Sequence, residues 1–194
     1  MGLKKRAYSV LIVSSSLKFI TAIRPLLPES KYTPITSVGS LAEGKRRLIE
    51  REYDFVIINS PLPDGGGDTL AIDVCEKKGS VALMLLRQDV RDEVEERVSE
   101  YGVFTLGKPV PREVFLAALG WMAGTRERLR RSEKKTQSLE TRMEEIRIVN
   151  RAKWMLISEL KLDEPEAHRY IEKQAMDRCV SKREIAEEII KTYM

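Results

Sequence analysis

Short apolar runs alternate with helical patterns five times through the first part of the chain. Three runs are rich in apolar residues at 9–13, 54–59 and 81–86, and weaker runs lie at 32–38 and 103–106. Because the strongest runs are apolar at consecutive rather than alternate positions, they are typical of strands buried on both faces. The pattern predicts an α/β fold with a five-stranded parallel sheet and helices on both faces. In such sheets, functional side chains usually lie at the carboxyl ends of the strands.

A change in sequence pattern after Gly124 divides the chain. Up to that residue, helical patterns separate the apolar runs at 17–27, 41–51, 69–78, 90–101 and 112–122. Beyond it the strand-like runs stop and a charged helical stretch follows. We therefore expect a first domain at 1–124, a linker helix at 125–150 and a C-terminal domain at 139–194 that shares its first helix with the linker.

The linker helix carries a heptad pattern that starts at Met122. Its a and d positions are apolar at the two ends and polar in the middle, which predicts a weak homodimeric coiled coil. An Asn at an a position can fix the register of such a dimer. The alternative is a solvated connecting helix that packs only within its own domain. The expected dimer seam consists of Leu129, Leu139, Met143, Ile146 and Asn150.

Two helix starts divide the C-terminal domain into three helices. Asp163 and Ser181 each precede a Glu by three residues, as in a capping box, and Pro165 suits a first helical turn. Each helix has one apolar face, so the three should form a small all-α bundle. The expected core residues are Ile146, Val149, Leu156 and Leu160 in the first helix, Ala167, Tyr170, Ile171 and Ala175 in the second, and Ile185, Ala186, Ile189 and Tyr193 in the third.

Several short motifs follow one another through the C-terminal bundle. They are, in order, Arg151-Ala152-Lys153, Glu166-Ala167, Ala175-Met176-Asp177-Arg178 and Arg183-Glu184-Ile185-Ala186. With these motifs the chain resembles, from about Arg142 onward, the ANTAR family of RNA-binding antitermination domains. The resemblance implies binding to stem-loops in nascent transcripts, which prevents a terminator from forming. One position departs from the family, because Trp154 stands where a small residue is common. We expect the indole to pack in the core, and the alternative is an exposed indole that stacks on an unpaired base.

Asn59 ends the apolar run at 54–59, and Pro63 and Gly67 follow it four and eight residues further on. With this pattern the first domain resembles, over about residues 8–124, the receiver domain of two-component response regulators, which has a flavodoxin-like fold. In that family, an aspartate at the end of the third strand accepts a phosphoryl group, and a proline and a glycine follow it at fixed offsets. Pro63 and Gly67 hold these offsets from Asn59. The pair Lys108-Pro109 after the fifth strand also resembles the family.

The residues that would carry receiver chemistry differ in this chain. Ser14 and Ser15 replace the acidic pair that holds Mg²⁺ in the family, and Asn59 replaces the aspartate. Arg87 replaces a Ser or Thr, so only Lys108 matches. Amide and hydroxyl groups bring no charge to a hard cation and are poor phosphoryl acceptors. We expect no metal, no cofactor and no phosphorylation, and a silent structural site in which Lys108 bonds Asn59 or Ser14. The alternative is that Arg87 and Lys108 bind an anion or a carboxylate, so that a protein or small-ligand partner takes the place of phosphate.

Composition sets few limits on function. The chain has 194 residues and a net charge of +4, which is compatible with nucleic acid without requiring it. Cys75, Cys179 and the single His168 offer neither a disulfide framework nor the spacing of zinc ligands, so a cytoplasmic protein is expected. No stretch is long and apolar enough for a membrane span.

Basic side chains of the C-terminal bundle are the candidates for RNA contact. Helix periodicity puts Arg169 and Lys173 on the solvent side of the second helix. A helix start at Ser181 adds backbone N–H groups that favour phosphate. Each cation could equally be an ordinary surface charge, with Lys182 paired to Asp177 for example. The candidates are Arg151, Lys153, Arg169, Lys173, Arg178, Lys182 and Arg183.

These features predict a transcription antiterminator that is not an enzyme, with a receiver-like domain, a dimerising helix and an RNA-binding bundle. A second hypothesis is a phosphorylated response regulator that binds DNA through its three helices, but Ser14, Ser15 and Asn59 argue against its phosphorylation. A third is an interaction module that titrates another regulator through mixed dimers. Binding of an RNA stem-loop would separate the first hypothesis from the third.

Overall fold

The computed structural model of the chain describes residues 7–76 and 79–193. The chain divides into two compact units, Met1–Glu133 and Lys134–Met194. The first unit contains the sheet with its helices, and the second contains the helical bundle.

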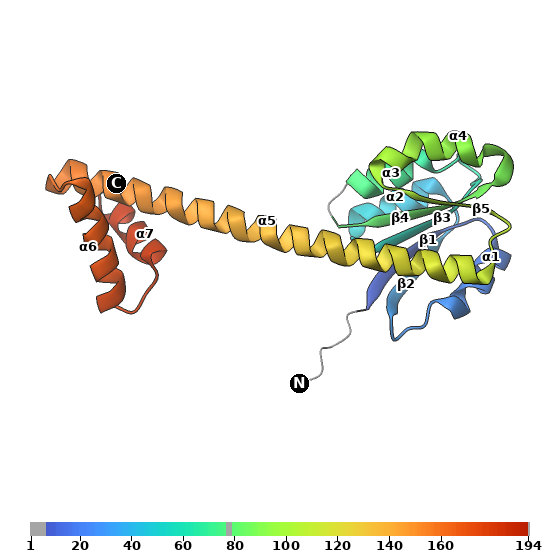
Figure 1. The fold of residues 1–194 in the computed structure, drawn as a ribbon, viewed down its shortest axis with the longest axis horizontal. Helices are drawn as coiled ribbons and strands as arrows, with labels where there is room; N and C mark the ends of the chain where they lie inside the picture. The colour runs from blue at the N-terminus through green and yellow to red at the C-terminus, as the bar shows by residue number, and fades with distance from the viewer. Residues whose placement is uncertain (1–6, 77–78, 194) are drawn as a thin grey trace. The chain divides into compact units, whose positions relative to one another are not determined.

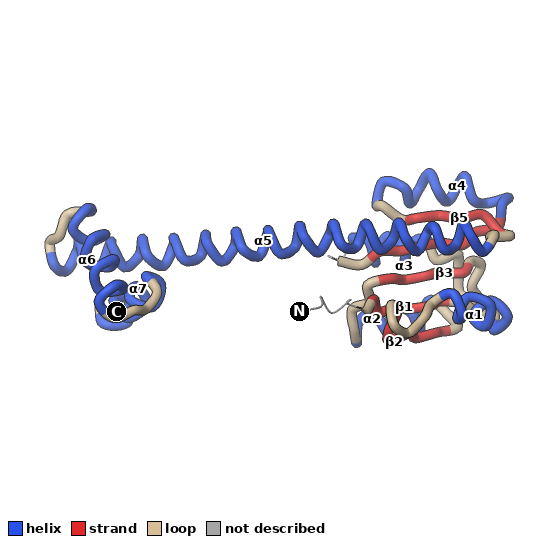
Figure 2. The backbone as a smooth tube through the Cα atoms, turned by 60° about the horizontal axis from the view of Figure 1, so that its bottom comes forward, coloured by secondary structure: helices blue, strands red, loops and turns tan. Residues whose placement is uncertain are grey.

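The first unit is built on a parallel sheet in the order β2-β1-β3-β4-β5. Figure 2 shows the strands side by side, with β2 and β5 at the two edges. All five predicted strands are present, so the predicted α/β fold is confirmed. The strands are β1 (Tyr8–Val13), β2 (Tyr32–Val38), β3 (Phe55–Asn59), β4 (Val81–Arg87) and β5 (Phe104–Lys108).

Helices cover both faces of the sheet (Figure 1). One face packs against α2, α3 and α4, and the other against α1 and the first part of α5. The patterns predicted at 17–27 and 90–101 each finish in a 3₁₀ turn, and residues 77–78 of the pattern at 69–78 lie outside the described part. The helices are α1 (Leu17–Ile23), η1 (Arg24–Leu26), α2 (Leu41–Glu50), α3 (Asp68–Glu76), α4 (Gln88–Val98), η2 (Ser99–Tyr101) and α5 (Arg112–Leu160).

The two cores explain why the strands are apolar at consecutive positions. In β3, Val56 and Ile58 pack on the side of α2, α3 and α4, whereas Phe55 and Ile57 pack on the side of α1 and α5. All four side chains are fully buried. Each contributes about 1.5–3 kcal/mol through removal of its surface from water, so a polar residue at any of these positions would be costly.

The helix α5 runs through Gly124 without a break. Phe115, Leu119 and Met122 are buried against the sheet, and α5 continues to pack on the first unit beyond Gly124. The structure therefore divides the chain after Glu133, later than the predicted boundary at Gly124. The reason is a group of charged side chains within the first two turns beyond Gly124.

This charged group binds α5 to the loop before β3. The Oδ1 atom of Asp54 accepts hydrogen bonds from Arg126 Nε at 2.9 Å and from Arg130 Nη2 at 2.7 Å. The backbone N–H of Ser9 donates to Oδ2 at 3.0 Å. Burial by itself would raise the pKa of Asp54, but the hydrogen bonds from Ser9 and Arg126 and the charge of Arg130 lower it. The two guanidinium groups are largely buried, so this interaction stabilises the start of α5 on the sheet more than an exposed ion pair would.

The second unit is a bundle of the C-terminal part of α5 with α6 (Glu164–Asp177) and α7 (Lys182–Thr192). Both predicted helix starts are confirmed: Asp163 caps α6 with a complete capping box, and Ser181 caps α7. The buried core consists of Ala152, Leu156, Ala167, Ile171, Ala175, Ile185, Ala186 and Ile189. None of the helices in the described part of the chain is long and apolar enough to cross a membrane.

Four residues predicted for this core are instead exposed. The exposed fractions are 54% for Ile146, 44% for Leu160, 41% for Tyr170 and 39% for Tyr193. Ile146 lies on the side of α5 away from the bundle core, because it is six residues before the buried Ala152 and therefore well over a quarter turn away from it around the helix. The reason is that Leu160 and Tyr193 lie at helix ends. Tyr170 lies at the margin of the apolar face of α6.

Replacing Asp54 with Asn should lower the free energy of unfolding of the first unit by about 2 kcal/mol at neutral pH, because two largely buried guanidinium groups lose the carboxylate that they share. The folded-state pKa of Asp54 is below its ordinary value of 3.8. Its contribution is therefore fully present above that value and is lost as the pH falls through the folded-state pKa. Urea unfolding followed by circular dichroism at neutral and acid pH measures both effects.

Asp92→Asn is the matched control for this experiment, because Asp92 is exposed on α4 and forms no ion pair within the described residues. Its stability should equal that of the wild type at neutral pH. If Asp54→Asn and Asp92→Asn unfold at the same urea concentration there, the proposed role of Asp54 is wrong.

Candidate functional site

Three predicted site residues form one hydrogen-bonded cluster at the carboxyl ends of the strands. Asn59 Nδ2 at the end of β3 donates to Ser14 Oγ after β1 at 3.0 Å. Lys108 Nζ at the end of β5 donates to Asn59 Oδ1 at 3.2 Å and also to the backbone oxygen of Ser60. Ser14 Oγ accepts a further hydrogen bond from the N–H of Ser16 at 3.1 Å. The topology of the sheet thus brings these side chains together, as the sequence predicts.

The cluster contains one positive charge and no negative charge. Asn59 and Ser14 are buried, and their hydrogen-bond partners are neutral except for Lys108. Burial lowers the pKa of Lys108, and the nearby charge of Arg87 lowers it further. Within the described residues Lys108 forms no ion pair, so its charge is uncompensated.

The remaining two predicted members lie outside this cluster. Ser15 is exposed. Arg87 is exposed as well, and its guanidinium group binds the carboxylate of Asp89 on the first turn of α4, with Nε to Oδ1 at 3.0 Å. Arg87 therefore influences Lys108 through its charge and does not share a hydrogen-bond partner with it.

The cluster does not fit the Mg²⁺ ion that receiver domains use. Mg²⁺ requires several oxygen ligands, usually with one or two carboxylates, and these positions supply a hydroxyl and an amide. Within the described part of the chain, no group of three or more His, Cys, Asp or Glu side chains could hold a metal ion.

Asp64 lies in the loop after β3, close to Asn59 in the sequence, and its carboxylate has a structural role. Its two carboxylate oxygens accept hydrogen bonds from the backbone N–H groups of Leu41 at 2.8 Å and Ala42 at 2.9 Å. These hydrogen bonds lower the pKa of Asp64. Asp64 therefore caps the start of α2 from a loop that is distant in the sequence.

Sequence reasoning missed a cavity that adjoins this cluster. It has a volume of about 470 Å³ and lies between α1 and the segment that joins β5 to α5. Lys108 lines it together with Arg112 and several apolar side chains. The only sequence signal is the short spacing of these two cations around Pro109-Val110-Pro111, which does not by itself indicate a cavity.

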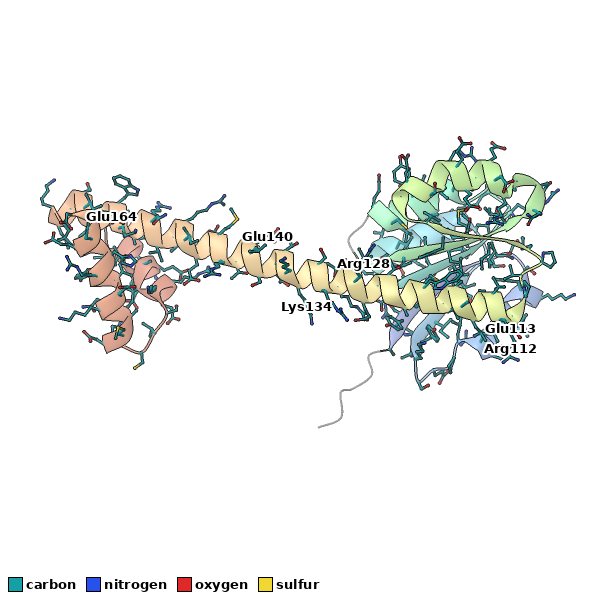
Figure 3. The ribbon with its side chains drawn as sticks, in the orientation of Figure 1. Arg112, Glu113, Arg128, Lys134, Glu140 and Glu164 are labelled. Atoms are coloured by element: carbon teal, nitrogen blue, oxygen red, sulfur yellow. The ribbon has the colours of Figure 1, made fainter. Side chains whose placement is uncertain are left out.

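The seven candidate cations for RNA lie on the surface of the second unit. Most of them form ion pairs with glutamates: Lys153 with Glu164 at 2.6 Å, Arg178 with Glu188 at 2.8 Å, Arg183 with Glu187 at 2.7 Å, and Lys182 with Glu172. Glu164 is labelled at the start of α6 in Figure 3. Arg169 donates to the backbone oxygen of Pro165 at 3.3 Å. The expected pairing of Lys182 with Asp177 is wrong, because Lys182 binds Glu172 instead.

Three of these ion pairs are exposed and therefore weak. The side chains of Arg178, Lys182 and Arg183 are each more than 40% exposed. Exposed pairs of this kind usually contribute less than about 1 kcal/mol. Lys153 differs, because its side chain is only 15% exposed and is therefore the least accessible of the four.

Trp154 does not pack in the core. Its side chain is 70% exposed. Ala152 and Leu156 are both buried, and a residue two positions from each of them on a helix points to the opposite side. The expectation of core packing was therefore wrong, and the spacing of the two buried neighbours was the signal that could have corrected it.

An apolar stripe remains uncovered on the same side of α5. Leu139, Met143 and Ile146 are 53%, 56% and 54% exposed, and Asn150 one turn further is also exposed. These four residues follow the predicted dimer seam. Leu129 does not belong to the exposed stripe, because its side chain is partly buried against the core formed by α1, α5 and the sheet.

Comparison with known proteins relates each unit to a characterised family. Residues 137–190 match the ANTAR domain. Over 183 residues, the chain is 24% identical to the transcriptional regulatory protein PdtaR of Mycobacterium tuberculosis (strain CDC 1551 / Oshkosh), with 94% of this chain and 89% of that protein covered. The sequence resemblance of the C-terminal bundle to ANTAR domains is thereby confirmed.

Solved receiver domains share the fold of the first unit. The signal receiver domain of an HD domain-containing protein from Pseudomonas fluorescens Pf-5 has a TM-score of 0.57 at 20% identity and covers 69% of this chain and 96% of its own. The non-phosphorylated HemR receiver domain from Leptospira biflexa has a TM-score of 0.52 at 25% identity, covering 59% and 93%. The chemotaxis response regulator CheY4 of Vibrio cholerae has a TM-score of 0.52 at 19% identity, covering 60% and 99%.

Proposed function

We propose that this chain, in which an ANTAR domain follows a receiver-like domain, is a transcription antiterminator that binds stem-loops in the leaders of nascent transcripts. The observation that carries the proposal is the match of residues 137–190 to the ANTAR domain, because that family is typically RNA-binding and non-enzymatic. The matched residues coincide with a unit that has its own buried core. The protein would act in the cytoplasm, on transcripts as they are made.

The proposed RNA surface combines exchangeable cations with an exposed aromatic ring. Phosphate oxygens would replace glutamates as partners of Arg178, Lys182 and Arg183, at small cost because the existing pairs are exposed. Unpaired loop bases are the part of a stem-loop that a protein can read, and they stack on aromatic side chains. Trp154 is exposed one turn beyond Arg151 and offers such a surface.

The proposed active form is a homodimer joined along α5. Leu139, Met143 and Ile146 would pack against the same residues of a second copy, and Asn150 would fix the register. Two bundles would then bind two stem-loops. The same stripe could instead join this chain to a different regulator, which is the mixed-dimer alternative and needs no RNA.

The receiver-like domain is proposed to act without phosphorylation. Asn59 lacks the charged oxygen that attacks phosphorus, and its amide is already engaged with Ser14 and Lys108. Asp64, the carboxylate in the same loop, is engaged with two backbone N–H groups of α2. A bound partner or ligand would take the place of the phosphoryl signal.

Incubation of the full-length protein with acetyl phosphate and Mg²⁺ should leave its intact mass unchanged, because the expected acceptor is an amide. Asp64→Asn provides a control that removes the nearest alternative acceptor. A stoichiometric, acid-labile gain of one phosphoryl group in the wild type would contradict this prediction. If that gain were absent from Asp64→Asn, Asp64 would be the acceptor.

Affinity for an RNA stem-loop, selected from a pool with a random loop, should fall steeply as the salt concentration rises. Replacing Arg169, Lys173 or Arg178 with Gln should lower the slope of log affinity against log salt by about 0.7 to 0.9 for each phosphate that the variant no longer binds. Fluorescence anisotropy over a salt series measures this slope. Arg46→Gln is the matched control, since Arg46 is exposed on α2 of the first unit.

Trp154→Ala should weaken binding in the same assay by about tenfold without changing the salt slope, because stacking involves no counterion release. Trp121→Ala is its control, because Trp121 is 56% exposed on the first unit.

Two results of the salt series would favour the mixed-dimer alternative over RNA binding. One is affinity that does not depend on salt, and the other is full affinity after Arg169, Lys173 and Arg178 are replaced together.

The wild-type protein should be a dimer by light scattering at tens of micromolar, and replacing both Leu139 and Ile146 with Lys should give a folded monomer, because four charges would meet at the seam of each dimer. Leu17→Lys with Ile49→Lys is the matched control, since these side chains are 79% and 83% exposed on the first unit. A monomeric wild type at this concentration would show that the exposed stripe does not pair by itself.

A further inference from the structure

The cavity beside Lys108 has the size and lining of a small-molecule site. Its volume of about 470 Å³ lies within the usual range for ligand pockets, about 300–1,000 Å³. Most of its wall is apolar, with Phe19, Ile23, Leu26, Leu85 and Phe115 among the lining residues. Ile23, Leu85 and Phe115 are buried in the core and are therefore held in place by packing.

The charged residues that line the cavity are both cationic. Lys108 and Arg112 line the cavity, and no Asp or Glu among the described residues does. Within that part of the chain neither cation forms an ion pair, although ion pairs are frequent elsewhere on it. Arg112 is exposed at the start of α5, as Figure 3 shows, so it can reach a ligand at the mouth.

The N–H donors of Lys108 and Arg112 that have no partner among the described residues at the cavity wall match a small anionic group. A lysine ammonium has three N–H donors, and Lys108 uses two of them on Asn59 Oδ1 and the backbone oxygen of Ser60. One donor remains, together with the planar fork of the Arg112 guanidinium group, which suits a carboxylate.

We propose that this cavity binds a small amphipathic carboxylate, with its apolar chain between α1 and the start of α5 and its carboxylate against Lys108 and Arg112. The bound carboxylate supplies the negative charge that the Ser14, Asn59 and Lys108 cluster lacks. Burial and Arg87 lower the pKa of Lys108 in the free protein, so a bound anion also offsets the cost of holding that charge.

The site is placed to influence the first unit. Lys108 belongs both to the cavity wall and to the cluster at the strand ends, and Phe115 belongs to the buried packing of α5 on the sheet. A ligand therefore touches the same cation that the receiver fold places beside its third strand. This inference deepens the sensory part of the proposed function, but it is tested by ligand binding alone and does not depend on RNA.

Isothermal titration of the full-length protein with decanoate below its micellar concentration tests the proposal, with 1-decanol as the uncharged probe. We expect one decanoate per chain, bound at least about tenfold more tightly than 1-decanol. Arg112→Gln should reduce that preference severalfold without affecting folding, because Arg112 is exposed. Lys108→Met should remove most of the preference and keep binding of 1-decanol.

A cavity-filling pair of variants separates this site from the exposed apolar stripe on α5. Ala22 lines the cavity and is exposed, so Ala22→Phe should abolish decanoate binding in a folded protein. Ala117→Phe, at an exposed position of α5 outside the cavity, should bind decanoate as the wild type does. Absence of one-to-one binding, equal affinity for 1-decanol, or unchanged binding by Ala22→Phe would each overturn the proposal. Loss of RNA binding in other variants would leave it standing.

Discussion

Burial of the sheet on both faces is the constraint on which the first unit depends. Because β1, β3 and β4 are surrounded by apolar side chains, polar groups can occur only where these strands end. The cluster of Ser14, Asn59 and Lys108 lies there, and each of its buried polar atoms has a hydrogen-bond partner in the described part of the chain. The fold therefore brings these polar side chains together at the strand ends, and the cluster that they form carries one positive charge.

The amide of Asn59 matters more for the charge of this region than for its shape. Asparagine is nearly isosteric with aspartate, but it presents an amide N–H to Ser14 and only one oxygen to Lys108. Asn59 and Ser14 are both neutral, and Lys108 carries the positive charge of the cluster. The uncompensated positive charge makes an anion the natural ligand of this region, and the adjoining cavity supplies the apolar surface that would add affinity and selectivity.

The parts of the structure that the sequence could predict are those set by local pattern. Consecutive apolar residues predicted the buried strands, and the Asp163 and Ser181 caps predicted the starts of α6 and α7. Features set by long-range packing could not be predicted in the same way. Nothing near Gly124 in the sequence signals that Arg126 and Arg130 bind Asp54, and the cavity depends on side chains from α1, β4, β5 and α5 that meet only in the fold.

The heptad pattern of α5 illustrates why periodicity alone cannot assign a partner. Met122 and Leu129 occupy seam positions and pack against the sheet of their own chain, whereas Leu139, Met143 and Ile146 occupy the same seam and are exposed. The repeat is the same in both segments, because an apolar stripe is required whether its partner is a sheet or a second helix. Among these seam positions, the exposed apolar side chains all belong to the second segment. A dimer would therefore have to form on the part of α5 that belongs to the ANTAR unit, next to Trp154 and the cations that could hold RNA.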